Sequence, residues 1–396
     1  MTAAWRSRCY NVDAVRTAAR RILPRPVFDF TDGGAEDEVT LRRNERDFRR
    51  YSLLPRPLNG PGTPDLSVQL FGRRLSLPLM IGPTGLAGLM WPGGEAAAAR
   101  AAAAAGTAYC LSHGSVCRLE DLPASASSNR WMQVFVYRDR SFTAELATRA
   151  AAAGYDALVL TTDNQVLGNR ERDIRNGFSI PPKFPLRDML VMTTKITWLM
   201  RMRSDLPRIT FGNYVREGEP MDIGTMAKRM ADLLDPTMSW KDVDALRKVW
   251  KGPLILKGIL HPDEAREAAK RGVDAIIVSN HGGRQLDGAA SGIAALPAIA
   301  EAMAGRMPVL LDGGIRRGSD VVKAIALGAA CCLIARPQLW GLAIAGEQGV
   351  AHVLDIFAKE IARSMTLIGA SRVSDLTRGV ISSNFGNQTR LEETHA

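Results

Sequence analysis

Eight short apolar runs recur along the chain, and most are separated by stretches rich in helix-forming residues. Continuous apolar runs of this length are typical of strands covered on both faces. Strands that alternate with helices form parallel sheets, and eight such units close into a barrel with the helices outside. The sequence therefore predicts an α/β protein, a (β/α)8 TIM barrel. The predicted strands span residues 78–81, 108–111, 131–136, 157–160, 254–256, 275–278, 309–311 and 332–334.

The segments outside these runs divide the chain further. Residues 1–75 predict an N-terminal helical cap with an extended lead-in, residues 76–375 the barrel, and residues 376–396 a C-terminal tail. A long insertion, residues 181–250, follows strand four. Its first part interleaves methionine, leucine and tryptophan with lysine and arginine, whereas residues 222–246 predict a soluble helix. The basic, apolar part favours a segment lying in a membrane interface over an ordinary lid or subunit-contact helix.

The net charge of +10 limits the classes of partner. Such a charge suits nucleic acid or an anionic membrane surface, but no nucleic-acid-binding motif accompanies it. An anionic cofactor, anionic substrates and membrane lipid explain the charge better.

The same sequence predicts where the protein resides. The N-terminus lacks the apolar region of a signal peptide, and no run of 18 apolar residues exists. The cysteines lack metal-site spacing and are expected to be reduced thiols, with no metal bound. They are Cys9, Cys110, Cys117, Cys331 and Cys332. We expect a cytoplasmic protein, or one peripheral on the inner face of the cell membrane.

Residues 279–287 (SNHGGRQLD) carry the most specific chemical signal. They follow the apolar run 275–278 directly, so His281 and Arg284 stand at the C-terminal end of a predicted strand, which is the active-site face of such barrels. Imidazole accepts a proton near neutral pH, and guanidinium binds a carboxylate through two parallel hydrogen bonds. A base beside an anion clamp suits the oxidation of a small acid next to its carboxylate.

Three motifs in order resemble one family. Residues 279–287, with 256–258 (LKG) and 312–318 (DGGIRRG), are similar to the FMN-dependent L-2-hydroxy acid dehydrogenases and oxidases. The likeness extends from about residue 28 to about residue 369. Residues 34–38, residues 81–86 and the insertion look most like the membrane-associated mandelate and L-lactate dehydrogenases.

The resemblance implies a set of cofactor-binding residues. Gly314, Arg316 and Arg336 would hold the FMN phosphate, and Asp312 the ribityl hydroxyls. Ala335 stands where the family usually has glycine. Lys257 would lie beside the flavin N1 and O2, and an ion-pair role is its structural alternative. Five further positions match family residues around the isoalloxazine ring, namely Thr84, Gly85, Ser112, Gln133 and Thr161. Ser279, the serine that opens the motif 279–287, is also assigned to the cofactor site. Gly85 favours a dehydrogenase, because many oxidases have alanine there.

The resemblance also implies the catalytic residues. His281 would be the base, Asp163 the carboxylate that orients it, and Arg284 the clamp for the substrate carboxylate. Arg170 matches a second arginine near the substrate, with a surface ion pair to Asp173 as its alternative.

Two departures from the family concern the substrate pocket. Phe30 and Phe135 replace tyrosines that usually hydrogen-bond the substrate, which removes two phenol donors. Tyr137 lies on the same strand face as Phe135, one layer away. Gly114 replaces a bulky residue of some relatives and predicts a roomier pocket, and His113 is an unusual donor at its mouth.

The leading interpretation is an FMN-dependent dehydrogenase that oxidises a bulky or aromatic L-2-hydroxy acid to the 2-oxo acid and passes electrons to a quinone. The alternative is a flavin-dependent oxidase of an amine, peptide or biosynthetic intermediate that uses dioxygen. A flavin protein that has lost catalysis is a third interpretation, supported only by the missing phenols. The resemblance further implies a homotetramer.

Overall fold

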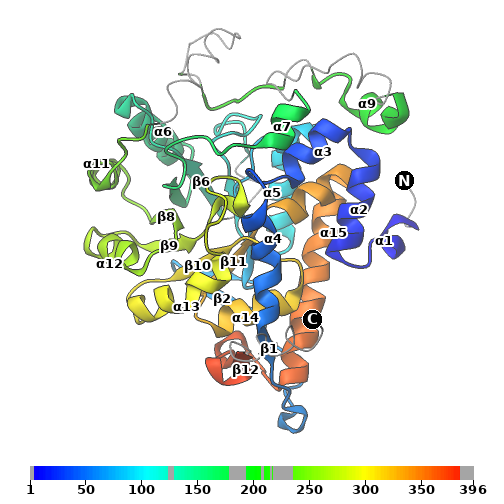
Figure 1. Ribbon diagram of the computed structural model, residues 1–396, viewed down its shortest axis with the longest axis vertical. Helices are drawn as coiled ribbons and strands as arrows, with labels where there is room; N and C mark the ends of the chain where they lie inside the picture. Colours follow the sequence, from blue (N-terminus) through cyan, green and yellow to red (C-terminus); the bar gives the residue numbers. More distant parts are fainter. Residues whose placement is uncertain are drawn as a thin grey trace, which may run out of the picture.

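The computed structural model describes residues 4–123, 129–177, 193–206, 209–214, 216 and 235–383. Its centre is a closed barrel with the strand order β10-β11-β4-β5-β6-β7-β8-β9, and neighbouring strands are parallel (Figure 1). The strands are β4 (Leu79–Ile81), β5 (Tyr109–Leu111), β6 (Arg130–Val134), β7 (Ala157–Thr161), β8 (Leu254–Ile259), β9 (Ala275–Val278), β10 (Val309–Asp312) and β11 (Cys331–Ile334). Each predicted strand overlaps one of these, so the predicted TIM barrel is confirmed.

Alternation along the strands divides the core in two. Val159 and Ile277 belong to the cluster inside the barrel, whereas Leu158 and Leu160 belong to the larger cluster between strands and helices. Both faces of the sheet are therefore apolar, which explains the unbroken apolar runs in the sequence. The covering helices are α5 (Gly94–Ala104), α6 (Arg140–Ala152), α11 (Trp240–Val249), α12 (Pro262–Lys270), α13 (Gly292–Met303), α14 (Gly318–Ala326) and α15 (Arg336–Ile368).

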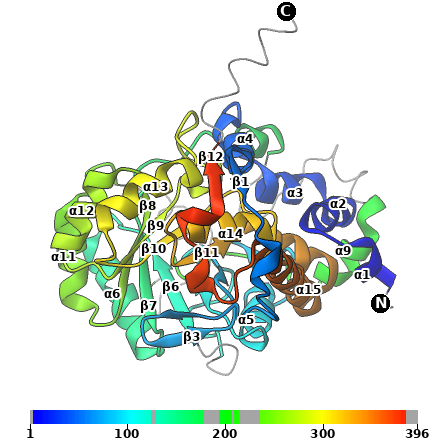
Figure 2. The same cartoon turned by 90° about the horizontal axis from the view of Figure 1, so that it is seen from below.

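Two small sheets finish the barrel. The hairpin of β2 (Val68–Leu70) and β3 (Arg73–Leu75) contributes to the cluster inside the barrel, and the Phe71 ring lies 5.8 Å from the Trp131 ring. β1 (Tyr51–Leu53) pairs antiparallel with β12 (Ile381–Ser383), which brings segments from the two ends of the chain together (Figure 2).

Over the described residues 4–75, the N-terminal segment contains four α-helices. It contains α1 (Ala4–Arg8), α2 (Val12–Ile22), α3 (Arg25–Asp32) and α4 (Val39–Arg46), and α2 packs against α15 (Figures 1 and 2). The domain limits given by the sequence remain predictions.

The insertion is described only in part. The basic, apolar stretch up to Met192 and most of the predicted helix over residues 222–246 lie outside the described residues. In α9 (Ile196–Met202), Ile196 and Met200 are exposed. Trp198 is fully buried and donates its indole N–H to Leu89 O at 3.1 Å, so this tryptophan cannot anchor in a membrane interface.

Candidate active site

His281 and Asp163 form a partly buried pair at the carboxyl ends of β9 and β7. His281 Nδ1 lies 2.8 Å from Asp163 Oδ1. A carboxylate only accepts hydrogen bonds, so Nδ1 carries the proton and Nε2 keeps its lone pair. Burial is the main reason that the pKa of His281 lies below its ordinary value, while Asp163 opposes this shift. His281 is therefore neutral near pH 7 and can act as a base through Nε2.

The backbone at His281 is itself unusual. His281 has a φ of +57°, and Gly282 and Gly283 follow with positive φ as well. A non-glycine residue in this region is strained, and such residues gather at functional sites. The Ser279 hydroxyl accepts from the His281 N–H at 3.1 Å, and the Asn280 side chain accepts from Gly283 N–H. These bonds hold the imidazole over the end of the strand.

Arg284 enters the same cavity from the segment after β9. One of its terminal nitrogens, Nη1, donates to Phe30 O and Gly33 O at 2.7 and 3.0 Å, and the guanidinium lies 5.1 Å from the Phe30 ring centre. Burial, followed by the charges of Arg170 and Arg336, places the pKa of Arg284 well below its ordinary value. The loss of water and the nearby positive charges both destabilise the charged form of Arg284. An anion bound here would offset this destabilisation.

Arg170 lies behind this group. Its Nε and Nη2 donate to Arg284 O and to Gln285 Oε1, at 3.4 and 3.3 Å. Among the described residues no salt bridge within 4 Å joins Arg170 to Asp173, although the charge of Asp173 partly offsets the lowering of the Arg170 pKa by burial. Arg170 therefore supports the Arg284 segment.

Lys257, two residues before the end of β8, is a buried cation with two polar partners. Its Nζ lies 3.2 Å from Asp312 Oδ2 and donates to Ser279 Oγ at 2.9 Å. Burial alone would lower the pKa of Lys257, but Asp312 and Asp163 more than offset it and the pKa is raised. Lys257 thus stays charged. Lys257 can both pair with Asp312 and contact the flavin, because this ion pair lies in the wall of the cavity.

Gln133 links the ends of β5, β6 and β7. Its Oε1 accepts from Ser112 Oγ at 3.2 Å and from His113 N–H at 2.9 Å, and its Nε2 donates to Thr161 Oγ1 at 3.0 Å. Ser112 also accepts from Gly114 N–H. The chain of bonds fixes three polar side chains along one wall.

The loops after β10 and β11 form a cationic cradle. Gly314 has a φ of +78°, and a Cβ there would lie 2.0 Å from Asn44 O, so only glycine fits. Arg336 donates to Thr31 O, Gly33 O and Gly282 O, and burial lowers its pKa to about 10. Arg316 pairs with Glu45 at 2.8 Å. Two arginines beside glycine N–H groups suit a phosphate.

One cavity joins these groups. It contains fifteen of the predicted site residues, namely Phe30, Thr84, Gly85, Ser112, Gln133, Phe135, Thr161, Lys257, His281, Arg284, Asp312, Gly314, Arg316, Ala335 and Arg336. Asp163, Arg170 and Ser279 contact its lining through hydrogen bonds. Asp312 Oδ1 is buried without a hydrogen-bond partner among the described residues, as expected of an acceptor for a ligand hydroxyl. The phosphate cradle, the unpaired acceptor Asp312 Oδ1 and the cation Lys257 together fit the chemical groups of FMN.

His113 and Gly114 are placed differently from the sequence expectation. His113 is fully buried, hydrogen-bonds Tyr137 Oη through Nε2, and has a pKa lowered by burial to about 3. It is not a donor at the pocket mouth but supports the wall from behind, 5.3 Å from the Phe135 ring. A Cβ on Gly114 would meet Phe211 at 3.5 Å, so Phe211 fills part of the expected space.

Sequence reasoning missed Gln338. This side chain is fully buried and donates to Thr84 Oγ1 at 2.7 Å, so it orients a hydroxyl of the cavity wall. Its position two residues after Arg336, on the first turn of α15, was the available signal.

Comparison with known proteins places this site in a family. The model of the family "FMN-dependent dehydrogenase" matches residues 19–383. The chain belongs to this family. It is accordingly an FMN-dependent oxidoreductase, as the geometry of the cradle indicates.

Individual members of the FMN-dependent dehydrogenase family are similar over nearly their whole length. An L-lactate dehydrogenase of Ectopseudomonas mendocina is 42% identical over 371 residues, which cover 92% of this chain and 97% of that protein. An L-lactate dehydrogenase of Alcaligenes faecalis is 43% identical over 367 residues, covering 91% and 96%. The structure of the monotopic membrane protein (S)-mandelate dehydrogenase superimposes with a TM-score of 0.90 at 35% identity, covering 94% and 99%. A mandelate oxidase superimposes with a TM-score of 0.79 at 36% identity, covering 94% and 98%.

Proposed function

We propose that the enzyme oxidises an L-2-hydroxy acid to the 2-oxo acid and passes the electrons to a quinone-type acceptor. The observation that carries this proposal is the meeting of His281, whose Nε2 is free to accept a proton, and Arg284 in one cavity. FMN, when bound, supplies the two-electron acceptor. Lactate and mandelate, the substrates named for the similar proteins, both belong to this class.

Different side chains of the cavity bind the substrate, accept its proton and hold the cofactor. Arg284 binds the substrate carboxylate through the nitrogens that no described backbone carbonyl occupies, with Arg170 behind it. His281 Nε2 takes a proton from the substrate, from either the hydroxyl group or the α-carbon, and Asp163 stabilises the imidazolium that results. Lys257, Gln133 and Thr161 would hold the isoalloxazine, and Arg316 and Arg336 the phosphate.

The substrate itself is proposed from the cavity wall. Phe30 and Phe135 are half-buried and apolar. They favour a hydroxy acid whose second substituent is apolar and bulky, including an aromatic one. Anaerobic flavin bleaching by a panel of L-2-hydroxy acids tests this directly, and no bleaching by any of them would contradict the proposed function.

The variant Phe135→Tyr is expected to tighten substrate binding. A phenol at this position restores one donor toward the substrate, and a net hydrogen bond of about 0.5–1.5 kcal/mol lowers KM by roughly twofold to tenfold. Steady-state kinetics with the best acid of the panel measures the change. Phe135→Leu serves as the control, since it changes the ring without adding a donor. A KM unchanged or raised in Phe135→Tyr would show that residue 135 does not face the substrate.

The pH dependence of flavin reduction follows from His281. The base must be neutral, and its pKa is lowered from the ordinary value of about 6.5. The rate constant is therefore expected to be constant through neutral pH and to fall only as the pH drops below that ordinary value. Because Asp163 raises the pKa of His281, Asp163→Asn should lower the plateau and move the acidic limb to still lower pH. Stopped-flow reduction across pH measures both, and a limb above the ordinary pKa would contradict the assignment.

The electron acceptor and the location are part of the proposal. Gly85 packs so that a Cβ would lie 3.2 Å from Gly114 O, which leaves little room for the alanine of many oxidases. None of the described helices is both long and apolar enough to cross a bilayer. We expect peripheral attachment to the inner face of the cell membrane through the insertion, and a homotetramer. Slow peroxide formation with dioxygen and fast reduction of a soluble quinone would support the dehydrogenase over the oxidase.

A further inference from the structure

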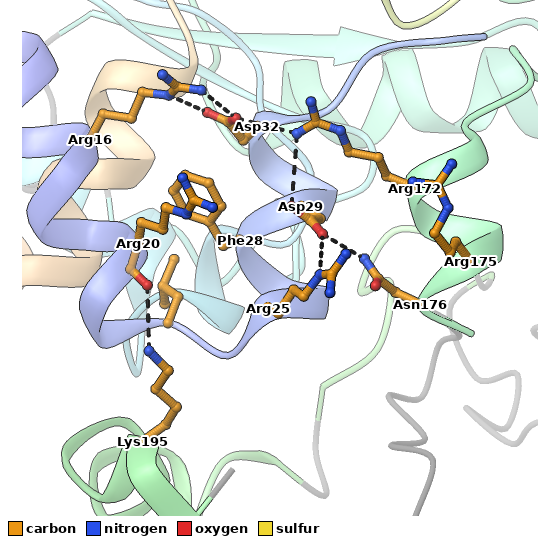
Figure 3. A pocket seen from close by; sticks show the side chains of 11 residues that line it. Arg16, Arg20, Arg25, Phe28, Asp29, Asp32, Arg172, Arg175, Asn176 and Lys195 are labelled. Atoms are coloured by element: carbon orange, nitrogen blue, oxygen red, sulfur yellow. Dashed lines mark hydrogen bonds and ion pairs between the residues drawn. The ribbon is translucent and has the colours of Figure 1, made fainter. Parts of the chain in front are cut away.

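A second cavity lies on the opposite side of α3 from the flavin cavity. It has a volume of about 590 Å³ and lies between α2, α3, α7 (Glu171–Arg175) and the short turn Thr193–Lys195 (Figure 3). We call it the basic hollow. Its lining is Arg16, Arg20, Leu23, Arg25, Phe28, Asp29, Asp32, Arg172, Arg175, Asn176 and Lys195.

The two acids of the basic hollow are already satisfied. Asp32 accepts from Nε and Nη2 of Arg16, both at 2.7 Å, and lies 3.6 Å from Arg172. Asp29 accepts from Asn176 Nδ2 at 2.9 Å and from Arg25 at 3.3 Å (Figure 3). These carboxylates therefore cannot neutralise the remaining cations of the lining.

Arg20 and Lys195 are those remaining cations. Among the described residues neither has a carboxylate partner: the Arg20 guanidinium lies 6.0 Å from the Phe28 ring centre, and Lys195 Nζ donates only to backbone carbonyls of Arg20 and Arg21. Arg175, on α7, also lines the basic hollow and pairs with Glu171 at 3.9 Å. A concave site with surplus positive charge focuses the field on an anion.

Exposed apolar side chains flank these cations. Ile174 precedes Arg175 and is 71% exposed, and Ile196 follows Lys195 and is 57% exposed. Met200, on α9, is also exposed. Cations with exposed apolar neighbours along the chain are typical of segments that meet anionic lipid.

We propose that the basic hollow binds the phosphate group of an anionic ligand through Arg20 and Lys195. The chemistry is the same for a phospholipid headgroup and for a soluble phosphate monoester. The exposed apolar side chains next to these cations favour the headgroup, and this choice of source rests on the proposed membrane location, whereas the anion site does not.

The experiment measures binding of the flavin-loaded protein to two probes. One is glycerol 3-phosphate, followed by calorimetry, and the other is phosphatidylcholine vesicles with and without phosphatidylglycerol, followed by co-sedimentation. Each of Arg20→Gln and Lys195→Gln should weaken binding roughly fivefold, and the double variant roughly thirtyfold, since one basic residue near an anionic surface contributes about that factor. The double variant Arg138→Gln/Lys248→Gln is the control, because it removes the same charge from exposed positions outside the basic hollow.

The possible outcomes distinguish a lipid headgroup from a soluble phosphate ester, and they distinguish the anion site from the proposed enzymatic function. Weakened binding to the vesicles, to glycerol 3-phosphate, or to both, in the hollow variants but not in the control, supports the site and identifies the source. Equal loss in the hollow and control variants, or no binding of either probe, overturns it. Flavin absorbance and reduction by hydroxy acid with a soluble dye should be unchanged in all variants. Failure of hydroxy acid to reduce the wild type would instead count against the proposed function alone.

Discussion

Replacing His281 with glutamine is expected to slow flavin reduction by the hydroxy acid by about 10²–10⁴-fold, the usual contribution of a general base. Glutamine fills a similar volume but has no basic nitrogen. The flavin should stay bound, because the phosphate cradle and Lys257 are untouched. Anaerobic stopped-flow absorbance measures the reduction rate, and the visible spectrum of the purified variant measures cofactor content.

Two further results bear on this assignment. Asp163→Asn is the matched variant, since it keeps His281 but removes the carboxylate that accepts from Nδ1 at 2.8 Å. It should lose rate and show the shifted acidic limb, whereas His281→Gln should show no acidic limb at all. An unchanged rate in His281→Gln would eliminate the histidine as base, and a wild-type protein that is never reduced would indicate a flavin protein without this activity.

Replacing Lys257 with methionine is expected to slow flavin reduction by roughly 10²–10³-fold, as when one preorganised electrostatic group is removed. Lys257 is a buried cation of the cavity wall, paired with Asp312 at 3.2 Å, and without it charge that develops on the cofactor would lose its counter-charge. The variant also leaves Asp312 buried without its ion pair, at a cost of about 3–5 kcal/mol in the free energy of unfolding. Stopped-flow reduction and urea unfolding measure the two effects.

A double variant separates the two effects of Lys257. Lys257→Met/Asp312→Asn removes both charges, so stability should recover in part while the reduction rate stays low. Lys257→Arg keeps the charge and should retain more rate than Lys257→Met. Recovery of the rate together with stability in the double variant would mean that Lys257 acts only as the ion-pair partner of Asp312.

The sequence was a good guide to the barrel for a physical reason. Strands of a closed parallel barrel are covered on both faces, so β9 and β11 appear as uninterrupted apolar runs bounded by polar residues. The site residues were found because they stand where those runs end. Asp312 is the last residue of β10, Lys257 lies two residues before the end of β8, and His281 lies three residues after the end of β9.

What the sequence could not give is the direction of a side chain and the contacts between distant segments. His113 neighbours Ser112, yet its ring points away from the cavity toward Tyr137, a contact across 24 positions. The support of Arg284 by Phe30 O spans 254 positions. The basic hollow likewise combines α2 with Lys195, and no local pattern relates residues so far apart.

Gly33 O accepts hydrogen bonds from both Arg284 and Arg336, at 3.0 and 2.9 Å. The guanidinium assigned to the substrate and the one assigned to the FMN phosphate thus share a single carbonyl at the end of α3. Any movement of that carbonyl alters both affinities at once, and thermodynamic reciprocity then requires each ligand to change the dissociation constant of the other. A variant that binds the substrate weakly should therefore also bind FMN weakly, and a variant that binds FMN weakly should bind the substrate weakly.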